Sequence, residues 1–235
     1  MKVRQKRERG DEVNLKSEKE KLIVIEGLDG SGKATQAKLL YDRLSEQNMK
    51  VREVSFPDYD SDSSALVKMY LNGEFGNTPG SVNAYAASSF YAVDRYASYK
   101  RDWQDDYKEG IIIADRYTTS NAIHQCSKLS KEEWDDYLIW LSEFEYEKLE
   151  IPKPDIVIYL KVDVTVSQEL MNQRYHGDTS KKDIHESDVD YLKKSREAAE
   201  YCSQKLGWKI VECCVDGKMR SKEEIHREIL KIINI

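Results

Sequence analysis

The segment from Gly27 to Thr35, GLDGSGKAT, restricts what the chain can fold into more than any other feature. Gly27, Gly32 and Lys33 have the spacing G-x-x-x-x-G-K of a phosphate-binding loop, or P-loop. The continuous apolar run KLIVIE (21–26) leads into it and is typical of a buried parallel strand. Apolar residues at helical spacing follow between positions 34 and 47. A strand, a glycine-rich turn and a helix in this order predict a nest of backbone amides that binds phosphate.

Strand and helix patterns alternate along the rest of the chain. We predict further strands over residues 51–56, 111–115, 154–162 and 208–215. Helices are predicted over 61–73, 82–107, 131–147, 165–176, 186–206 and 221–233. This alternation predicts right-handed crossovers and a five-stranded parallel sheet with helices on both faces. No linker interrupts the pattern, so we expect a single α/β domain over residues 21–235.

Charge and hydropathy exclude several classes of protein. The net charge is −6, with 37 Lys and Arg against 43 Asp and Glu, which argues against a general nucleic-acid-binding protein. The longest aliphatic runs, 22–25 and 111–114, are far too short to span a membrane. The four cysteines form no C-x-x-C pair and follow no secretory leader, so we expect free thiols in the cytoplasm.

Residues 1–20 differ from the rest of the chain, because they are almost free of apolar residues. We expect a charged, flexible tail, as is usual for such termini. Five of the first nine residues are basic, so a nucleic-acid-binding or targeting arm is the alternative.

Two further segments carry residues suited to a nucleotide. In FYAVDRY (90–96), Tyr91 and Arg95 are four residues apart and share one helix face, which suits a planar base. The alternative is an amphipathic helix with a core tyrosine and a surface arginine. In IIIADRY (111–117), a buried strand delivers Asp115 and Arg116 to the crevice where open α/β sheets bind ligands. A structural pair capping the strand is the alternative.

Together with Phe56-Pro57, these segments resemble the thymidylate kinase family in order and separation, over about residues 21–233. The resemblance implies a P-loop NTPase fold with a mobile lid near residues 172–186. It implies that the γ-phosphoryl group of ATP is transferred to dTMP, giving dTDP and ADP, in dTTP biosynthesis. It further implies Mg²⁺ as cofactor, a homodimer in the cytoplasm, and no nucleic acid or membrane partner.

The resemblance also assigns roles to residues. It places Lys33, Asp115, Arg116 and Arg174 in catalysis, with Asp115 near Mg²⁺, directly or through water. ATP would contact Arg174 and the loop residues Gly27, Leu28, Asp29, Gly30, Ser31, Gly32, Lys33, Ala34 and Thr35. In the dTMP site, Tyr91 would stack on the base, Arg95 would read its edge, and Arg116 would bind the acceptor phosphate. The remaining dTMP residues would be Asp29, Phe56, Ser120, Asn121 and Gln125. For Asp29 the alternative is turn chemistry, and for Phe56 a core position on a strand.

The chain departs from the expected patterns at two points: at Ala34 in the P-loop, and after Pro57, where Asp58 and Tyr59 stand although members of the resembled family often carry an arginine there. Ala34 stands where a Ser or Thr hydroxyl usually touches Mg²⁺, and Thr35 comes one residue later. Some members of the resembled family carry an arginine in the loop, where this chain has Gly30 and Ser31, so the resemblance implies that Arg174, Lys181 and Lys182 of the lid segment supply positive charge. A solvated joint between two helices is the alternative for that segment.

Two other functions fit the same motifs. One is a P-loop kinase that acts on another nucleoside monophosphate or on a deoxynucleoside. The other, suggested by Ala34, is a regulator that binds ATP without transferring phosphate.

Overall fold

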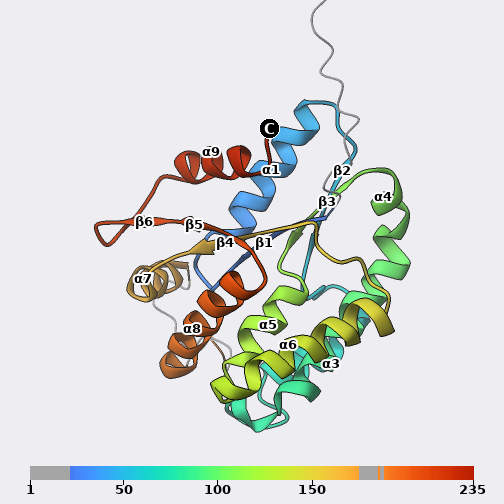
Figure 1. Cartoon of the computed structure of the whole chain (residues 1–235), viewed down its shortest axis with the longest axis vertical. Helices are drawn as coiled ribbons and strands as arrows, with labels where there is room; N and C mark the ends of the chain where they lie inside the picture. The colour runs from blue at the N-terminus through green and yellow to red at the C-terminus, as the bar shows by residue number, and fades with distance from the viewer. Residues whose placement is uncertain (1–21, 175–184, 186–187) are drawn as a thin grey trace, which may run out of the picture.

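The structure is a computed structural model that describes residues 22–174, 185 and 188–235. In this part of the chain, five parallel strands form one sheet in the order β2-β3-β1-β4-β5 (Figure 1). The strands are β1 (Leu22–Gly27), β2 (Val51–Ser55), β3 (Ile111–Asp115), β4 (Ile156–Lys161) and β5 (Lys209–Glu212). The predicted sheet is confirmed. Because β1 lies in the centre, the loop after it opens at the middle of the carboxyl edge.

Helices connect the strands and cover the sheet. They are α1 (Lys33–Glu46), α2 (Ala65–Leu71), α3 (Ala84–Ser98), α4 (Gln104–Glu109), α5 (Thr118–Cys126), α6 (Trp134–Ser142), α7 (Val164–Arg174), α8 (Val189–Lys205) and α9 (Lys222–Ile232). Short 3₁₀ turns span Asp62–Ser64, Pro79–Ser81 and Lys131–Glu133, and π-helical segments span Tyr99–Trp103 and Glu143–Lys148.

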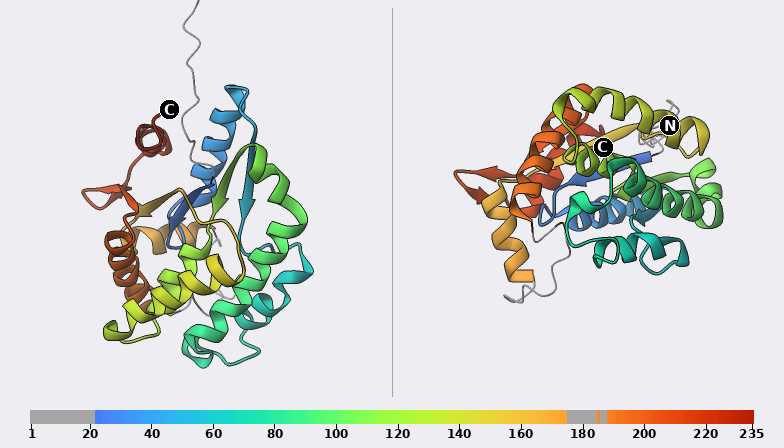
Figure 2. Two further views of the ribbon diagram at one scale, coloured as in Figure 1. Left: turned by 45° about the vertical axis from the view of Figure 1, so that its right-hand side comes forward. Right: turned by 90° about the horizontal axis from the view of Figure 1, so that it is seen from below.

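Two apolar layers sandwich the sheet, because successive strand residues point to opposite faces. On one face, Ile23 and Ile25 of β1 pack in a cluster with residues of α1 and α9. On the other, Leu22 and Val24 pack with residues of α5, α6 and α8. Figures 1 and 2 show the same arrangement of helices about the sheet.

Two expectations about single elements are corrected, and one helix was not predicted. The helix predicted over 82–107 is divided into α3, a π-helical segment and α4, and Trp103 of the π-helical segment is fully buried against Tyr99 and Tyr117. The strand predicted over 208–215 ends at Glu212. It is succeeded by β6 (Cys214–Val215) and β7 (Lys218–Met219), which form an antiparallel hairpin because Asp216 and Gly217 both adopt positive φ, as a tight turn requires. Helix α5 was not predicted, although Ser120, Asn121 and Gln125, which lie on it, were predicted as site residues.

None of the described helices is long and apolar enough to cross a membrane. Cys126, Cys202 and Cys213 are buried, Cys214 is half-buried, and all four are free thiols.

Candidate active site

A cavity of about 860 Å³ opens along the carboxyl edge of the sheet. This volume is in the usual range for small-molecule sites. Every predicted site residue lines it, except Gly27, Leu28 and Arg174. Gly27 and Leu28 lie just before the lining segment, and Arg174 is the last residue of α7, with a side chain outside the described part. The predicted lid, residues 172–186, lies almost wholly outside the described residues.

The P-loop forms one end of this cavity and joins β1 to α1. Gly30 has φ +77° and approaches α7 so closely that an added Cβ would lie 2.7 Å from the Ser167 carbonyl oxygen. Gly32 precedes the first helical residue with φ +86°, a conformation that favours glycine. The hydroxyl of Ser31 is buried and has no hydrogen-bond partner among the described residues. The loop therefore offers backbone amides and one hydroxyl to a ligand at a helix N-terminus.

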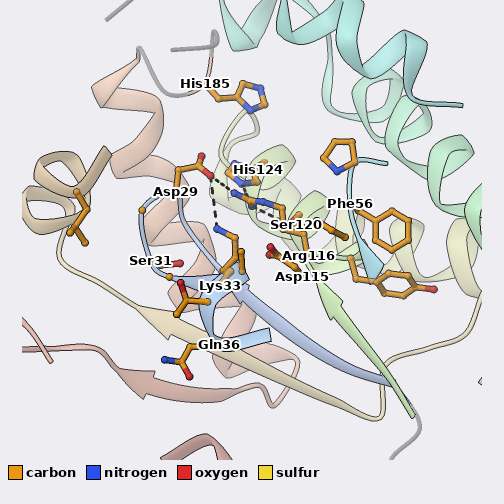
Figure 3. A pocket seen from close by; sticks show the side chains of 18 of the residues that line it. Asp29, Ser31, Lys33, Gln36, Phe56, Asp115, Arg116, Ser120, His124 and His185 are labelled. Carbon is orange, nitrogen blue, oxygen red and sulfur yellow. Dashed lines mark hydrogen bonds and ion pairs between the residues drawn. The ribbon is translucent and has the colours of Figure 1, made fainter. Parts of the chain in front are cut away.

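Lys33 begins α1 and turns back over the loop. Its Nζ donates a hydrogen bond to the Leu28 carbonyl oxygen at 3.0 Å and lies 3.9 Å from Asp29 Oδ1. Burial lowers the pKa of Lys33, and the nearby Arg116 lowers it further. Figure 3 shows Lys33 and Arg116 converging on Asp29 from different elements of the fold.

Arg116 comes directly after β3 and forms an ion pair with Asp29. Its φ is +66°, a strained conformation for a residue with a side chain, and such strain gathers at functional sites. Burial would raise the pKa of Asp29, but Arg116 and Lys33 hold it well below its usual range. Asp29 therefore stays ionised between two cations.

Glu26 forms a second ion pair with Arg116. It was not predicted as a site residue from the sequence. It is fully buried at the end of β1, with Oε1 3.7 Å from Arg116 Nη1. Its Oε2 accepts hydrogen bonds from the hydroxyls of Thr119 and Ser120, at 2.7 and 2.8 Å. Ser120 Oγ also accepts from Arg116 Nη1 at 3.4 Å, so Glu26 ties α5 to the arginine.

Asp115 ends β3 at the same edge, and its Oδ1 is buried without a hydrogen-bond partner among the described residues. An orphaned carboxylate oxygen at a phosphate-binding loop suits a hydrated Mg²⁺. No cluster of three or more His, Cys, Asp or Glu that could hold a metal occurs among the described residues. Asp115 is thus the residue that fits the predicted ion. Thr35 is exposed on the cavity wall, and Ala34 offers no hydroxyl.

The opposite end of the cavity is lined by Phe56, Tyr91, Arg95, Asn121 and Gln125. Tyr91 and Arg95 share one face of α3, as the spacing predicted. Arg95 is only 2% exposed and forms an ion pair with the fully buried Glu145. The Gln125 side chain is fully buried, and neither its oxygen nor its nitrogen has a hydrogen-bond partner among the described residues.

Aromatic and imidazole groups close the side of the cavity. His124 of α5 stacks with His185 and Tyr191, and its Nε2 lies 3.4 Å from Arg116 Nη1. Burial lowers the pKa of His124 to about 3, and Arg116 adds to the shift. His124 is therefore a neutral part of the cavity wall and is only 8% exposed.

Several other lining residues were missed because they are brought in by distant parts of the chain. They include Tyr59, Leu71, Leu170 and His185, and the segment after β5 adds Met219, Arg220, Lys222 and Ile225 near the P-loop. Glu145 is the missed residue that bonds directly to two predicted ones, Arg95 and Asn121. No local sequence pattern marks Glu145, because its partner Arg95 lies 50 residues away in the sequence.

A parallel sheet with β1 at its centre, a P-loop leading into α1, and Asp115 and Arg116 ending the neighbouring strand define a P-loop protein of the nucleotide-kinase class. Comparison with known proteins narrows this class. The profile described as "Thymidylate kinase" matches residues 25–229, and the chain belongs to the thymidylate kinase family.

Individual relatives agree with this assignment. The chain is 29% identical over 200 residues to a thymidylate kinase of Mycobacterium tuberculosis, covering 83% of this chain and 92% of the relative. It is 27% identical over 214 residues to a thymidylate kinase of Plasmodium falciparum, covering 91% and 89%. A solved structure of thymidylate kinase from Candida albicans has the same fold, with a TM-score of 0.66, 22% identity and 92% coverage of both chains.

Proposed function

We propose that the protein transfers the γ-phosphoryl group of ATP to dTMP, giving dTDP and ADP. One observation carries the proposal: a single cavity joins a P-loop to a pocket with an aromatic ring, an arginine and two amides, and Arg116 lies between them. Membership of the thymidylate kinase family supports the same reaction.

The triphosphate of ATP would bind along residues 27–35, with backbone amides around the phosphates and Lys33 beside the β- and γ-phosphates. For that, Lys33 must exchange its bond to the Leu28 carbonyl for a phosphate oxygen. Burial favours this exchange, because a desolvated ammonium gains more from an anion than an exposed one. Arg174 would add positive charge from the end of α7.

Arg116 would bind the acceptor phosphate, and Asp29 would keep the guanidinium in place. The reaction needs alignment of donor and acceptor and stabilisation of spreading negative charge, more than it needs a base. The acceptor phosphate is already an anion, so no side chain has to remove a proton from it.

Mg²⁺ would be held at Asp115, directly or through water, where the orphaned Oδ1 fits it. When bound with ATP, the ion neutralises charge on the β- and γ-phosphates. Because Ala34 has no hydroxyl, Asp115 would be the main protein group that binds the ion.

The base of dTMP would lie between Phe56 and Tyr91, with Arg95, Ser120, Asn121 and Gln125 around it. The unpartnered Gln125 amide supports this position, since a buried amide without hydrogen bonds is costly until a ligand satisfies it.

The protein would act as a homodimer in the cytoplasm. Tyr85, Val93 and Tyr96 lie within one sector of α3 and are 42%, 51% and 39% exposed, an apolar surface that suits helix packing against a second copy. Light scattering would test this, and Val93→Glu should convert a dimer to a monomer.

An acceptor panel tests the function. With ATP and Mg²⁺, dTMP should be the preferred acceptor among dTMP, dCMP, dGMP and thymidine. Preference for one of the others would identify a different kinase, and ATP binding without transfer would identify a regulator.

A further inference from the structure

Glu145 is a buried carboxylate that the proposed mechanism does not use. It lies in the π-helical segment Glu143–Lys148 and is fully buried, whereas Glu143 and Glu147 in the same segment are exposed. A buried carboxylate is costly unless charge and hydrogen bonds compensate it. The groups that compensate the charge of Glu145 therefore indicate its role.

Both carboxylate oxygens of Glu145 hold residues of the base pocket. Arg95 Nε donates to Oε2 at 2.9 Å, and Arg95 Nη2 donates to Oε1. Asn121 Nδ2 donates to the same Oε1 at 3.1 Å and to the Ser88 carbonyl oxygen at 3.2 Å. One carboxylate thus joins α3 and α5 at the end of the cavity.

These contacts fix which way the Asn121 amide points. Both hydrogens of Nδ2 are donated, to a carboxylate and a carbonyl, and a turned amide would place its own oxygen against those two acceptors. Asn121 Oδ1 receives no hydrogen bond from a described residue, so it remains an acceptor for a ligand. Arg95 is fixed in the same way. Its Nε and Nη2 are engaged, while Nη1 has no partner among the described residues and remains a donor.

Arg95 and Asn121 bind the same carboxylate oxygen and both line the cavity, so a fixed donor and a fixed acceptor together select one kind of base edge. Thymine and uracil present an N3–H donor next to an O4 acceptor, which complements Asn121 Oδ1 and Arg95 Nη1. Cytosine presents an N3 acceptor next to an N4 amine, so each of its groups would meet a like group. Gln125 has no partner among the described residues that fixes its amide, so it fits either edge and cannot select by itself.

We propose that Glu145 is a positioning residue that sets base selectivity, by orienting Arg95 and Asn121 so that the pocket accepts a thymine or uracil edge and rejects cytosine. This inference rests on the proposed function for the location of the base. It is independent of phosphoryl transfer, because it concerns binding.

The test compares binding of dTMP, dUMP and dCMP to the native protein and to Glu145→Gln by calorimetry. The native protein should bind dCMP at least about 100-fold more weakly than dTMP, because two buried polar groups would stay unsatisfied. Glu145→Gln should weaken dTMP and dUMP by the same factor, about 10 to 100, and leave dCMP unchanged or tighter. The KM for dTMP should rise with the dissociation constant, while kcat at saturation changes by less than about threefold.

Glu147→Gln is the matched control, since it removes the same charge from an exposed position of the same segment. It should change none of the three affinities. If Glu145→Gln fails to fold in a thermal melt, Glu145→Asp keeps the charge near Arg95 and withdraws the carboxylate from Asn121. The same loss confined to dTMP and dUMP is then expected.

Equal weakening of all three nucleotides would mean that Glu145 is only structural, and unchanged affinities would also overturn the proposal. Comparable binding of dTMP and dCMP by the native protein would overturn it without any variant. Selective dTMP binding with no phosphoryl transfer would instead refute the proposed function and leave the role of Glu145 standing.

Discussion

Lys33 Nζ lies 3.9 Å from Asp29 Oδ1, and the same carboxylate oxygen accepts a hydrogen bond from Arg116 Nη2. Asp29 therefore holds two cations from separate elements at the junction between the P-loop and β3 (Figure 3). Lys33 would contact the donor ATP and Arg116 the acceptor phosphate. The Asp29 carboxylate therefore holds the cations of the donor site and the acceptor site close to each other.

Lys33→Met should lower kcat by at least about 10²- to 10³-fold, because the transferring phosphoryl group loses a cation in a water-poor site. A steady-state assay with ATP and dTMP measures the loss. Lys38→Met is the control, since Lys38 is exposed and pairs with Asp42 one turn further along α1. Equal effects of the two substitutions would contradict the role of Lys33.

Arg95→Ala should raise KM for dTMP far more than KM for ATP, because Arg95 lines the end of the cavity away from the P-loop. It should also destabilise the protein by about 3 to 5 kcal/mol, since Glu145 is left buried without its partner. Urea denaturation measures the second effect. Adding Glu145→Gln to this variant should restore part of the stability but none of the dTMP affinity. Equal increases in both KM values would exclude a role in base recognition.

Acid should destabilise the protein through His124. The unfolded chain protonates this residue near pH 6.5, while the folded protein resists protonation down to about pH 3. Between these values the unfolded state binds more protons, so the free energy of unfolding falls as the pH falls. From pH 7 to pH 5 this residue should contribute a loss of about 2 kcal/mol.

Urea denaturation of the native protein and of His124→Gln at both pH values measures this contribution. The variant should lose about 2 kcal/mol less than the native protein on acidification. Identical losses would show that His124 titrates normally in the folded state.

Removal of residues 1–20 should leave kcat and both KM values unchanged within about twofold, because short charged termini rarely contribute to a folded site. The truncated and full-length proteins can be compared in the same assay. A large loss of activity would favour the alternative of a functional arm.

The buried strands and the P-loop could be predicted because their patterns are local. Residues 22–25 place apolar side chains on both faces, as the central strand of a covered sheet requires, and phosphate binding requires Gly32 and Lys33 at their positions in the loop. Helix α5 was not predicted, because residues 118–126 combine small, polar and apolar side chains on a helix that is buried on one side and lines the cavity on the other.

Glu145 could not be found from local patterns. The three glutamates of EFEYEK have similar sequence surroundings. Only Glu145 is buried, because it packs against Arg95, which lies 50 residues earlier in the sequence. His185 is similar, since its contacts with Tyr70 and His124 join segments more than 60 residues apart. Long-range pairing of charged and polar groups is therefore the part of the site that sequence alone leaves open.

Product analysis after incubating the purified protein with ATP, Mg²⁺ and dTMP tests the proposed reaction most directly. dTDP and ADP should appear in equal amounts, and Lys33→Met should form neither product at a comparable rate. ADP formation without dTDP, or no turnover together with no binding of ATP, would contradict the proposed reaction.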